Sequence, residues 1–197
     1  MTHCIVPLKS TLKELGEKET NEILSDFSCP KNKDVEAFLL SGAVALDLQS
    51  KSRTYLVYGV DDNSRTLAGY FTLSLKNISV PHTAVQRKFR EKLKRFSKLQ
   101  DGFYTFPLIL IGQLGKNYTN EADKLINGDK LLACALDKVR EAQDIIGGRF
   151  VLLECEDVPD LIEYYERNSF SCYGQRYLDS DETNLKGNYL LQWLRIT

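Results

Sequence analysis

Histidine is scarce in this chain, which has only two among its 197 residues. His3 lies near one end and His82 follows Pro81 in a predicted loop, so we interpret both as solvated residues without a chemical role. This scarcity disfavours hydrolases of the Ser-His-Asp and Cys-His types, and metal sites built from several histidines. We therefore predict no metal centre.

Cysteine pairs and long apolar runs are missing as well. The five cysteines are scattered, odd in number and never spaced as C-x-x-C, which disfavours a disulfide framework or a zinc site. No stretch approaches the ~20 apolar residues of a membrane helix. The opening MTHCIVPLKS holds no apolar run long enough for a secretory signal. These absences predict a cytoplasmic protein with no membrane contact.

An excess of charge is also absent, because the formal net charge is −1 at pH 7. This balance argues against general attraction to polyanions, although it leaves room for a local basic face. Hydrophobic residues make up 43% and charged residues 27%, as in ordinary soluble globular proteins. The length is most simply that of one domain, residues 1–197, able to bury a core.

The patterns that are present predict strands and helices in alternation. Runs rich in β-branched and apolar residues predict strands at Cys4–Leu8, Thr54–Val60, Thr66–Leu75, Phe106–Gly115, Arg149–Cys155, Ser169–Tyr177 and Asn188–Ile196. Apolar residues at helical spacing predict helices from Ser10, over Val35–Leu48, Ala84–Leu99 and Asn127–Gly148, and after Pro159. This order predicts an α/β protein with a mixed sheet and helices on both faces.

Several local features are predicted within these elements. Asp34 is expected to cap the helix that follows it. Its buried stripe is expected to comprise Val35, Phe38, Leu39, Gly42 and Leu46. The two strands between Thr54 and Leu75 are expected to form an antiparallel hairpin around the turn Asp61–Arg65.

Two glycines, Gly112 and Gly115, interrupt the apolar strand Phe106–Gly115. Glycine weakens a strand, so each one indicates a bulge, tight packing or the close approach of a ligand. Taken alone, packing is the favoured interpretation. The next helix starts at Asn127-Gly128-Asp129, and its unpaired N–H groups are suited to an anion such as a phosphate.

Two segments resemble the GCN5-related N-acetyltransferase (GNAT) family. LILIGQLG, followed after a loop by GDKLLACALDKV, resembles the acetyl-CoA motif of that family. DLIEYYERNSF resembles a later motif, and aligning Phe170 with its Phe puts Tyr165, not Tyr164, at the position of the general acid. The opening FSCPKNKDVEAFLLSGA resembles a subset that includes toxins which acetylate aminoacyl-tRNA.

The resemblance implies an acyl-CoA N-acyltransferase fold, α/β with a mixed, mostly antiparallel central sheet. It implies acetyl-CoA as co-substrate, Tyr165 as general acid and the backbone N–H of Leu114 as donor to the oxyanion. The implied coenzyme-binding residues are Leu114, Gly115, Lys116, Lys124, Leu125, Asn127, Gly128, Asp129 and Lys130.

The chain departs from the family pattern in two places. The phosphate loop of the family usually reads Gln or Arg, two residues, Gly, one residue, then Gly or Ala. Here Asp123 stands where the family has Gln or Arg, and Ile126 stands where the family has the first glycine. Only the last glycine, Gly128, is kept. The Asn found seven residues before the catalytic Tyr is replaced by Val158.

The acceptor is left open by the sequence. The first hypothesis is acetylation of a primary amine in a small molecule or peptide. The alternatives are toxin-like acetylation of aminoacyl-tRNA, bound through the basic segment Arg87–Lys98, and a non-catalytic protein that binds acyl-CoA or a partner. Glu154, Glu156 and Asp157 are candidates to hold a water chain as general base, although a solvated loop is favoured. A homodimer joined through the strand Asn188–Ile196 is a further hypothesis.

Overall fold

A computed structural model describes the chain except residues 1, 61–63, 86, 181, 183–184 and 186. Its helices are α1 (Leu8–Leu15), α2 (Glu17–Ser25), α3 (Lys33–Ala37), the π-helical turn η1 (Phe38–Gly42), α4 (Ala43–Leu48), α5 (Arg87–Leu93), the 3₁₀ helix η2 (Thr119–Lys124), α6 (Gly128–Ile146) and α7 (Pro159–Arg167). Its strands are β1 (Thr2–Pro7), β2 (Arg53–Val60), β3 (Arg65–Pro81), β4 (Leu99–Gln100), β5 (Phe103–Lys116), β6 (Phe150–Cys155), β7 (Ser171–Tyr177) and β8 (Tyr189–Ile196).

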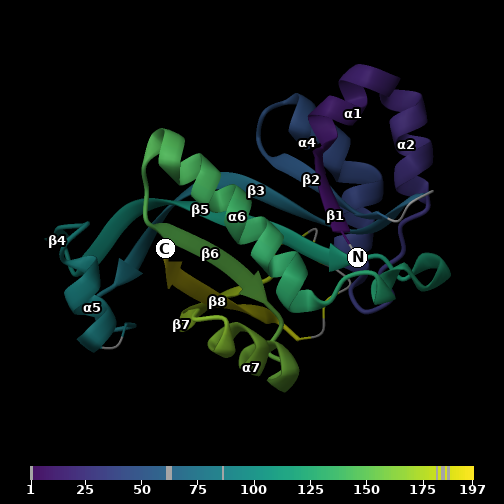
Figure 1. The fold of residues 1–197 in the computed structure, drawn as a ribbon. Coiled ribbons are helices and arrows are strands. Elements are labelled where there is room, and N and C mark those ends of the chain that lie inside the picture. The colour runs from purple at the N-terminus through teal and green to yellow at the C-terminus, as the bar shows by residue number, and fades with distance from the viewer. Residues whose placement is uncertain (1, 61–63, 86, 181, 183–184, 186) are drawn as a thin grey trace. The chain divides into compact units, whose positions relative to one another are not determined.

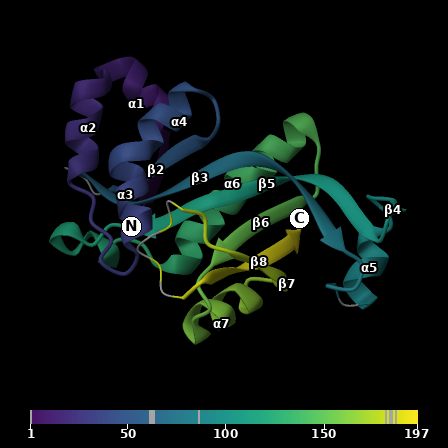
Figure 2. The same ribbon diagram turned by 180° about the vertical axis from the view of Figure 1, so that it is seen from behind.

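The described strands form a sheet with the order β1-β2-β3-β5-β6-β8-β7, and β4 pairs with β5. Antiparallel pairing joins β1 to β2, β2 to β3, β4 to β5, and β8 to both β6 and β7. Figures 1 and 2 show the same ribbon from front and back. The predicted fold class, a mixed and mostly antiparallel α/β sheet, is confirmed.

The chain divides into two compact units, and each is described by itself. The first comprises residues 1–74, 111–141 and 180–185. The second comprises residues 75–110, 142–179 and 186–197. The single domain expected over residues 1–197 stays a prediction.

In the first unit, helices cover both faces of the strands. Leu56, Leu67 and Tyr70 share a core with residues of α1, α2, α3 and α4. The opposite face meets α6, because a Cβ added at Gly69 of β3 would lie 3.3 Å from Leu131 of that helix. This confirms the predicted placement of helices on both sides (Figures 1 and 2).

The start of the helical segment after residue 32 differs from the prediction. Asn32, not Asp34, is the N-cap: its side-chain oxygen accepts the N–H groups of Asp34 and Val35 at 3.0 Å each. The π-helical turn η1 then adds a residue to one turn and shifts the buried stripe. Ala43 and Asp47 are therefore buried, whereas Gly42 and Leu46 are only half-buried.

In the second unit, the last strand lies inside the sheet. β8 pairs with β6 on one side and with β7 on the other. Both of its edges are therefore occupied, so the idea that this strand joins two copies in a homodimer is wrong. A homodimer formed in another way stays a prediction.

The short hairpin between β4 and β5 was not predicted. Asp101 and Gly102 form its turn with φ of 51° and 84°, which pairs Gln100 with Phe103. Asp-Gly between extended residues is a strong hairpin signal, and it was available in the sequence. The turn predicted at Asp61–Arg65 falls mostly outside the described residues, but the hairpin around it is confirmed.

Candidate active site

The second half of β5 exposes part of its backbone, although β5 lies inside the sheet order. Ile111 and Gly115 are buried, but Gly112 is exposed and Leu114 is half-buried. β5 has 14 residues and its neighbour β6 has six, so β6 cannot pair with β5 along its whole length. Gly112 has no side chain, so its exposure means that main-chain atoms reach the surface at this point of the strand.

Gly115 has a packing role. A Cβ at this position would collide with Cγ1 of Val35 in α3 and lie 3.4 Å from the ring of Phe27. The hydroxyl of Tyr70 donates to the carbonyl of Val35 at 2.5 Å, which holds α3 close to the strands. Tight helix packing therefore explains this glycine, whereas it does not explain the exposed Gly112.

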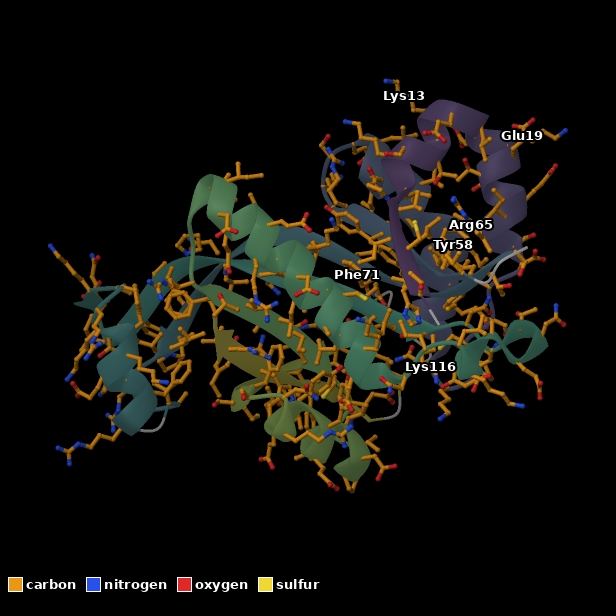
Figure 3. The ribbon with its side chains drawn as sticks, viewed as in Figure 1. Lys13, Glu19, Tyr58, Arg65, Phe71 and Lys116 are labelled. Atoms are coloured by element: carbon orange, nitrogen blue, oxygen red, sulfur yellow. The ribbon has the colours of Figure 1, made fainter. Side chains whose placement is uncertain are left out.

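The three lysines expected to surround a phosphate lie in different surroundings. Lys116, labelled in Figure 3, has its ammonium 5.8 Å from the centre of the Tyr118 ring. Lys124 is exposed and forms an ion pair with Glu121. Lys130 is exposed and makes no ion pair with another residue in the part of the chain that is described. Its charge is the most available of the three.

The start of α6 is capped by Asn127. Its side-chain oxygen accepts the N–H of Lys130 at 2.8 Å, and its carbonyl accepts the N–H of Leu131 at 3.0 Å. Asn127, Asp129 and Lys130 are exposed. The predicted helix start is confirmed, but one of its N–H groups is already used by the cap.

The loop before α6 is fastened to β1. Nε2 of His3 lies 2.9 Å from the carbonyl oxygen of Leu125, one of the predicted coenzyme residues. The interpretation of His3 as a solvated residue is wrong, because it is half-buried and hydrogen-bonded, whereas its lack of a chemical role stays a prediction. The sequence offered no signal for this contact, because the two residues are 122 positions apart.

Tyr165 lies in the second unit, on α7, and packs in the core. It is buried, and its ring centre lies 5.9 Å from that of Phe170 and 6.1 Å from that of Trp193. Its carbonyl accepts the N–H of Phe170 at 3.0 Å. Tyr164 is half-buried, with the guanidinium of Arg167 5.1 Å from its ring centre.

The hydroxyl of Tyr165 makes no hydrogen bond to another described residue, and the residue as a whole is only 8% exposed. Burial of the ring, followed by the neighbouring Cys155 and Tyr164, raises the pKa of this phenol well above its usual value. The group is thus protonated at neutral pH and able to donate.

Glu154 is occupied by other side chains. Its carboxylate accepts Nε of Arg176 at 2.7 Å and Nε2 of Gln192 at 2.8 Å, and Nζ of Lys76 lies 3.6 Å away. A carboxylate held in this way joins side chains of β6, β7 and β8, and both of its oxygens are engaged. Asp157 accepts the hydroxyl of Tyr189 at 2.6 Å. The structure offers neither residue as a free base.

The basic segment forms a shorter helix than predicted. α5 covers Arg87–Leu93, and its residues Phe89 and Leu93 pack, together with the preceding Val85, onto β-strands of the second unit. Lys94 forms an ion pair with Glu91 at 2.7 Å. The exposed cations with described side chains are Arg87, Lys92, Lys94, Arg95 and Lys98.

Neither a group of metal-binding side chains nor a membrane-crossing helix is found in the described part of the chain. Among the described residues, no three His, Cys, Asp or Glu side chains are grouped so that they could hold a metal ion. None of the helices in the described part of the chain combines the length and the apolar character that crossing a bilayer requires.

Known proteins resemble this chain in structure but not in sequence. No family model and no curated protein matches it. The structure of AtaT complexed with acetyl-methionyl-tRNAfMet superposes with a TM-score of 0.63 at 17% identity, over 96% of this chain and 94% of AtaT. The chain has the fold of this toxin. A GNAT-like fold is thereby confirmed.

Two further toxin structures share this fold. A tyrosine-to-phenylalanine mutant of AtaT, bound to acetyl-CoA and to the C-terminus of the antitoxin AtaR, matches with a TM-score of 0.54 at 18% identity, over 88% of this chain and 85% of the other. A tyrosine-to-phenylalanine mutant of KacT matches with a TM-score of 0.62 at 16% identity, over 97% of this chain and 94% of KacT.

The predicted site residues fall into both units. All nine predicted coenzyme residues, from Leu114 to Lys130, belong to the first unit, and Tyr165 belongs to the second. A further residue of this region, Asn117, was missed. It is a polar residue directly after an apolar strand, and such a position was the one available signal.

Proposed function

We propose that this protein is an acetyl-CoA-dependent N-acetyltransferase. The observation that carries the proposal is the exposed Gly112, which lies in a strand that leads through a loop into the start of α6. The toxin fold supports it, because AtaT has been solved with acetyl-CoA bound. In this proposal acetyl-CoA lies along β5, and its pyrophosphate is held near Asn127–Lys130.

The proposed reaction is direct attack of a neutral amine on the thioester carbonyl. A C–N bond forms, the C–S bond breaks, and the amine loses a proton to water. The N–H of Leu114 donates to the oxyanion of the tetrahedral intermediate. Tyr165 donates its proton to the sulfur as negative charge develops on it, so that the product is a thiol, and the proton that the amine released to water restores the phenol. A tyrosine was replaced by phenylalanine in the solved mutants of AtaT and KacT, and this is in line with the proposal that a tyrosine takes part in the reaction.

The acceptor that we favour is the amino group of an aminoacyl-tRNA. AtaT was solved with acetyl-methionyl-tRNAfMet, and the exposed cations of the α5 region supply a surface for phosphates. Acetylation of a small-molecule or peptide amine is the second candidate. The deciding assay adds the protein and acetyl-CoA to a translation extract. A block that requires acetyl-CoA supports the tRNA acceptor, and translation that proceeds at every dose rejects it.

Binding and turnover of the coenzyme test the proposal itself. Calorimetry should show binding of acetyl-CoA, and a thiol-release assay over aminoacyl-tRNA and a panel of amines should show turnover. Protein that binds the coenzyme without turnover would favour the non-catalytic alternative. No binding and no turnover would exclude the acetyltransferase.

A protein partner is also proposed. AtaT binds the C-terminus of the antitoxin AtaR. A reading frame beside that of this protein should encode a small protein that co-purifies with it and stops thiol release. A neighbouring product that neither binds nor inhibits would reject this partner.

A further inference from the structure

Asn117, the first residue after β5, is a buried centre of hydrogen bonds. Its side chain is 3% exposed, and its own N–H donates to the carbonyl of Ala68 at 2.9 Å. Nδ2 donates to the carbonyl of Leu67 at 2.9 Å and to that of Asp26 at 3.3 Å. Oδ1 accepts the N–H groups of Ser28 and Thr119 at 3.0 and 3.1 Å. The amide thus uses both its donors and its acceptor, as burial demands.

These bonds join separate segments of the first unit. Leu67 and Ala68 lie on β3, where the register with β2 shifts by one residue. Asp26 and Ser28 lie in the loop between α2 and α3. Thr119 begins the loop that leads to α6, and Tyr118 donates its N–H to the carbonyl of Ser28 at 2.8 Å. One side chain therefore fastens the loop before α6 to both β3 and the loop before α3.

Two consecutive residues of this loop have an energetically unfavourable backbone conformation. Asn120 and Glu121, neither of them glycine, have positive φ of 49° and 62° in succession. Such backbone conformations persist only where the surrounding contacts impose them. The buried Ala122 and Ile126 anchor the far side of the loop. The near side is anchored by Asn117.

We propose that Asn117 is the positioning residue of the coenzyme loop, residues 117–127. It holds Leu125, Asn127 and the start of α6 in the arrangement that receives the coenzyme, without touching the coenzyme itself. The inference rests on the proposed function and extends it, because it names the group that pre-forms the site.

Asn117→Asp is the decisive variant, since it keeps the shape and replaces the two donors by an oxygen that faces the carbonyls of Leu67 and Asp26. The affinity for acetyl-CoA should fall by about tenfold or more. In the thiol-release assay KM for acetyl-CoA should rise while kcat at saturation is kept. If this variant does not fold, Asn117→Ala removes the same bonds without adding a charge.

Two control variants separate positioning from charge and from stability. Asn21→Asp adds the same charge to an exposed residue of α2, in the first unit but outside the coenzyme loop. Asp47→Asn weakens a buried carboxylate elsewhere in the first unit, which accepts the N–H of Thr54 at 2.9 Å. Both should leave the affinity within about threefold, although Asp47→Asn should lower Tm as Asn117→Asp does.

The outcomes separate this inference from the proposed function. If Asn117→Asp and Asp47→Asn lower Tm alike and change the coenzyme affinity alike, the positioning role is rejected. If native protein binds no acetyl-CoA, the proposed function fails, and hydrogen exchange decides the positioning role instead. Asn117→Asp should then speed the exchange of the Ser28 and Thr119 amides and of residues 120–126 more than Asp47→Asn does. Equal exchange in the two variants would overturn it.

Discussion

Adjacent tyrosines in one short helix have different surroundings. The ring of Tyr165 lies in the core against Phe170 and Trp193, whereas Tyr164 is half-buried beside Arg167. The hydroxyl of Tyr165 makes no hydrogen bond to another described residue, although its ring is buried. A phenol of this kind can donate to a substrate without breaking a bond that the fold uses.

Replacement of Tyr165 by Phe should therefore lower activity and leave stability nearly unchanged. We expect kcat to fall by about 100-fold, the lower range for loss of a general acid. The free energy of unfolding should change by no more than about 0.5 kcal/mol, because the hydroxyl bonds to no described residue. Thiol release and urea denaturation measure the two effects. Tyr164→Phe is the matched control and should keep full activity; a fully active Tyr165→Phe would reject the assigned role.

The pH profile tests the same hydroxyl. Because the pKa of Tyr165 is raised, the phenol is protonated throughout the range below its usual value of about 10. The profile of kcat/KM should rise as the acceptor amine loses its proton, and should show no fall caused by Tyr165 below about pH 10. A falling limb near pH 8 that disappears in Tyr165→Phe would contradict this assignment.

Glu36 is the carboxylate that fastens the loop before α3. It accepts the Lys33 ammonium and the N–H of Cys29 at 2.6 Å, together with the hydroxyl of Ser28 at 3.0 Å. The hydrogen bond from Lys33, followed by that from Cys29, holds the pKa of this carboxyl below its usual value. Its ionised form is therefore the one that the folded protein prefers.

The stability that Glu36 provides should depend on pH in a defined direction. A lowered folded pKa means that the contribution is complete above the unfolded value of about 4.3 and is lost as the pH falls through the folded pKa. Between about pH 5.5 and 3.5, Tm of native protein should fall further than Tm of Glu36→Gln. Glu22→Gln, an exposed control, should follow the native curve. Parallel curves for Glu36→Gln and native protein would show that Glu36 contributes nothing.

At the scale of elements, β5 uses its two glycines differently. Gly115 allows α3 to approach, because any side chain there would meet Val35. Gly112 is exposed on the same strand. The sequence alone favoured packing for both, and burial separates them.

Gly115→Ala should destabilise the protein by about 1–3 kcal/mol, the cost of overpacking a core. Val35→Ala opens the space that the new methyl group needs. The double variant should therefore be more stable than the sum of the single changes predicts, by at least about 0.5 kcal/mol. Urea denaturation of the four proteins gives this coupling. Strict additivity would mean that the contact with Val35 does not limit residue 115.

Gly112→Ala is the companion test on the same strand. The added methyl group should change stability little, because this residue is exposed. It should weaken acetyl-CoA binding if the coenzyme lies along β5. Unchanged affinity would place the coenzyme elsewhere.

At the scale of the whole molecule, positive and negative charges nearly balance, but they are distributed unevenly along the chain. The net charge is −1, yet the described cations of the α5 region gather in a short stretch of the second unit. Lys94 already has a partner in Glu91. Arg90 and Arg95 are therefore better probes of nucleic-acid binding than Lys94.

Arg90→Glu combined with Arg95→Glu should relieve the proposed block of translation by about tenfold or more, because binding to phosphates carries most non-specific affinity. The slope of log affinity for tRNA against log salt should fall by about one for each phosphate that the variant no longer binds. Acetylation of a small amine should be kept. Lys13→Glu combined with Lys18→Glu makes the same charge change on α1 and α2 and should relieve nothing. Equal effects of the two pairs would reject a specific role of α5.

Local features of the fold could be predicted because they depend on near neighbours in the sequence. The strand Phe106–Gly115, the start of α6 at Asn127–Asp129, Pro159 at the start of α7 and the alternation of elements follow from apolar periodicity and from the properties of Gly and Pro. The positions of Tyr165 and of the coenzyme residues came from a resemblance of motifs, and the confirmed fold is compatible with them.

Features that join distant residues were decided only by the tertiary structure. His3 contacts the carbonyl of Leu125, and Asn117 connects β3 with the loops before α3 and α6. The carboxylate of Glu154 accepts hydrogen bonds from Arg176 and Gln192. β8 lies between β6 and β7 because of the order of strands in the sheet, which no single segment encodes. Periodicity reports which side of a segment is buried, whereas the partner of a buried polar group depends on how separate segments pack. For that reason the sequence by itself determined most of the elements and the resemblance of motifs, and the tertiary structure determined which carboxylates, amides and hydroxyls have partners.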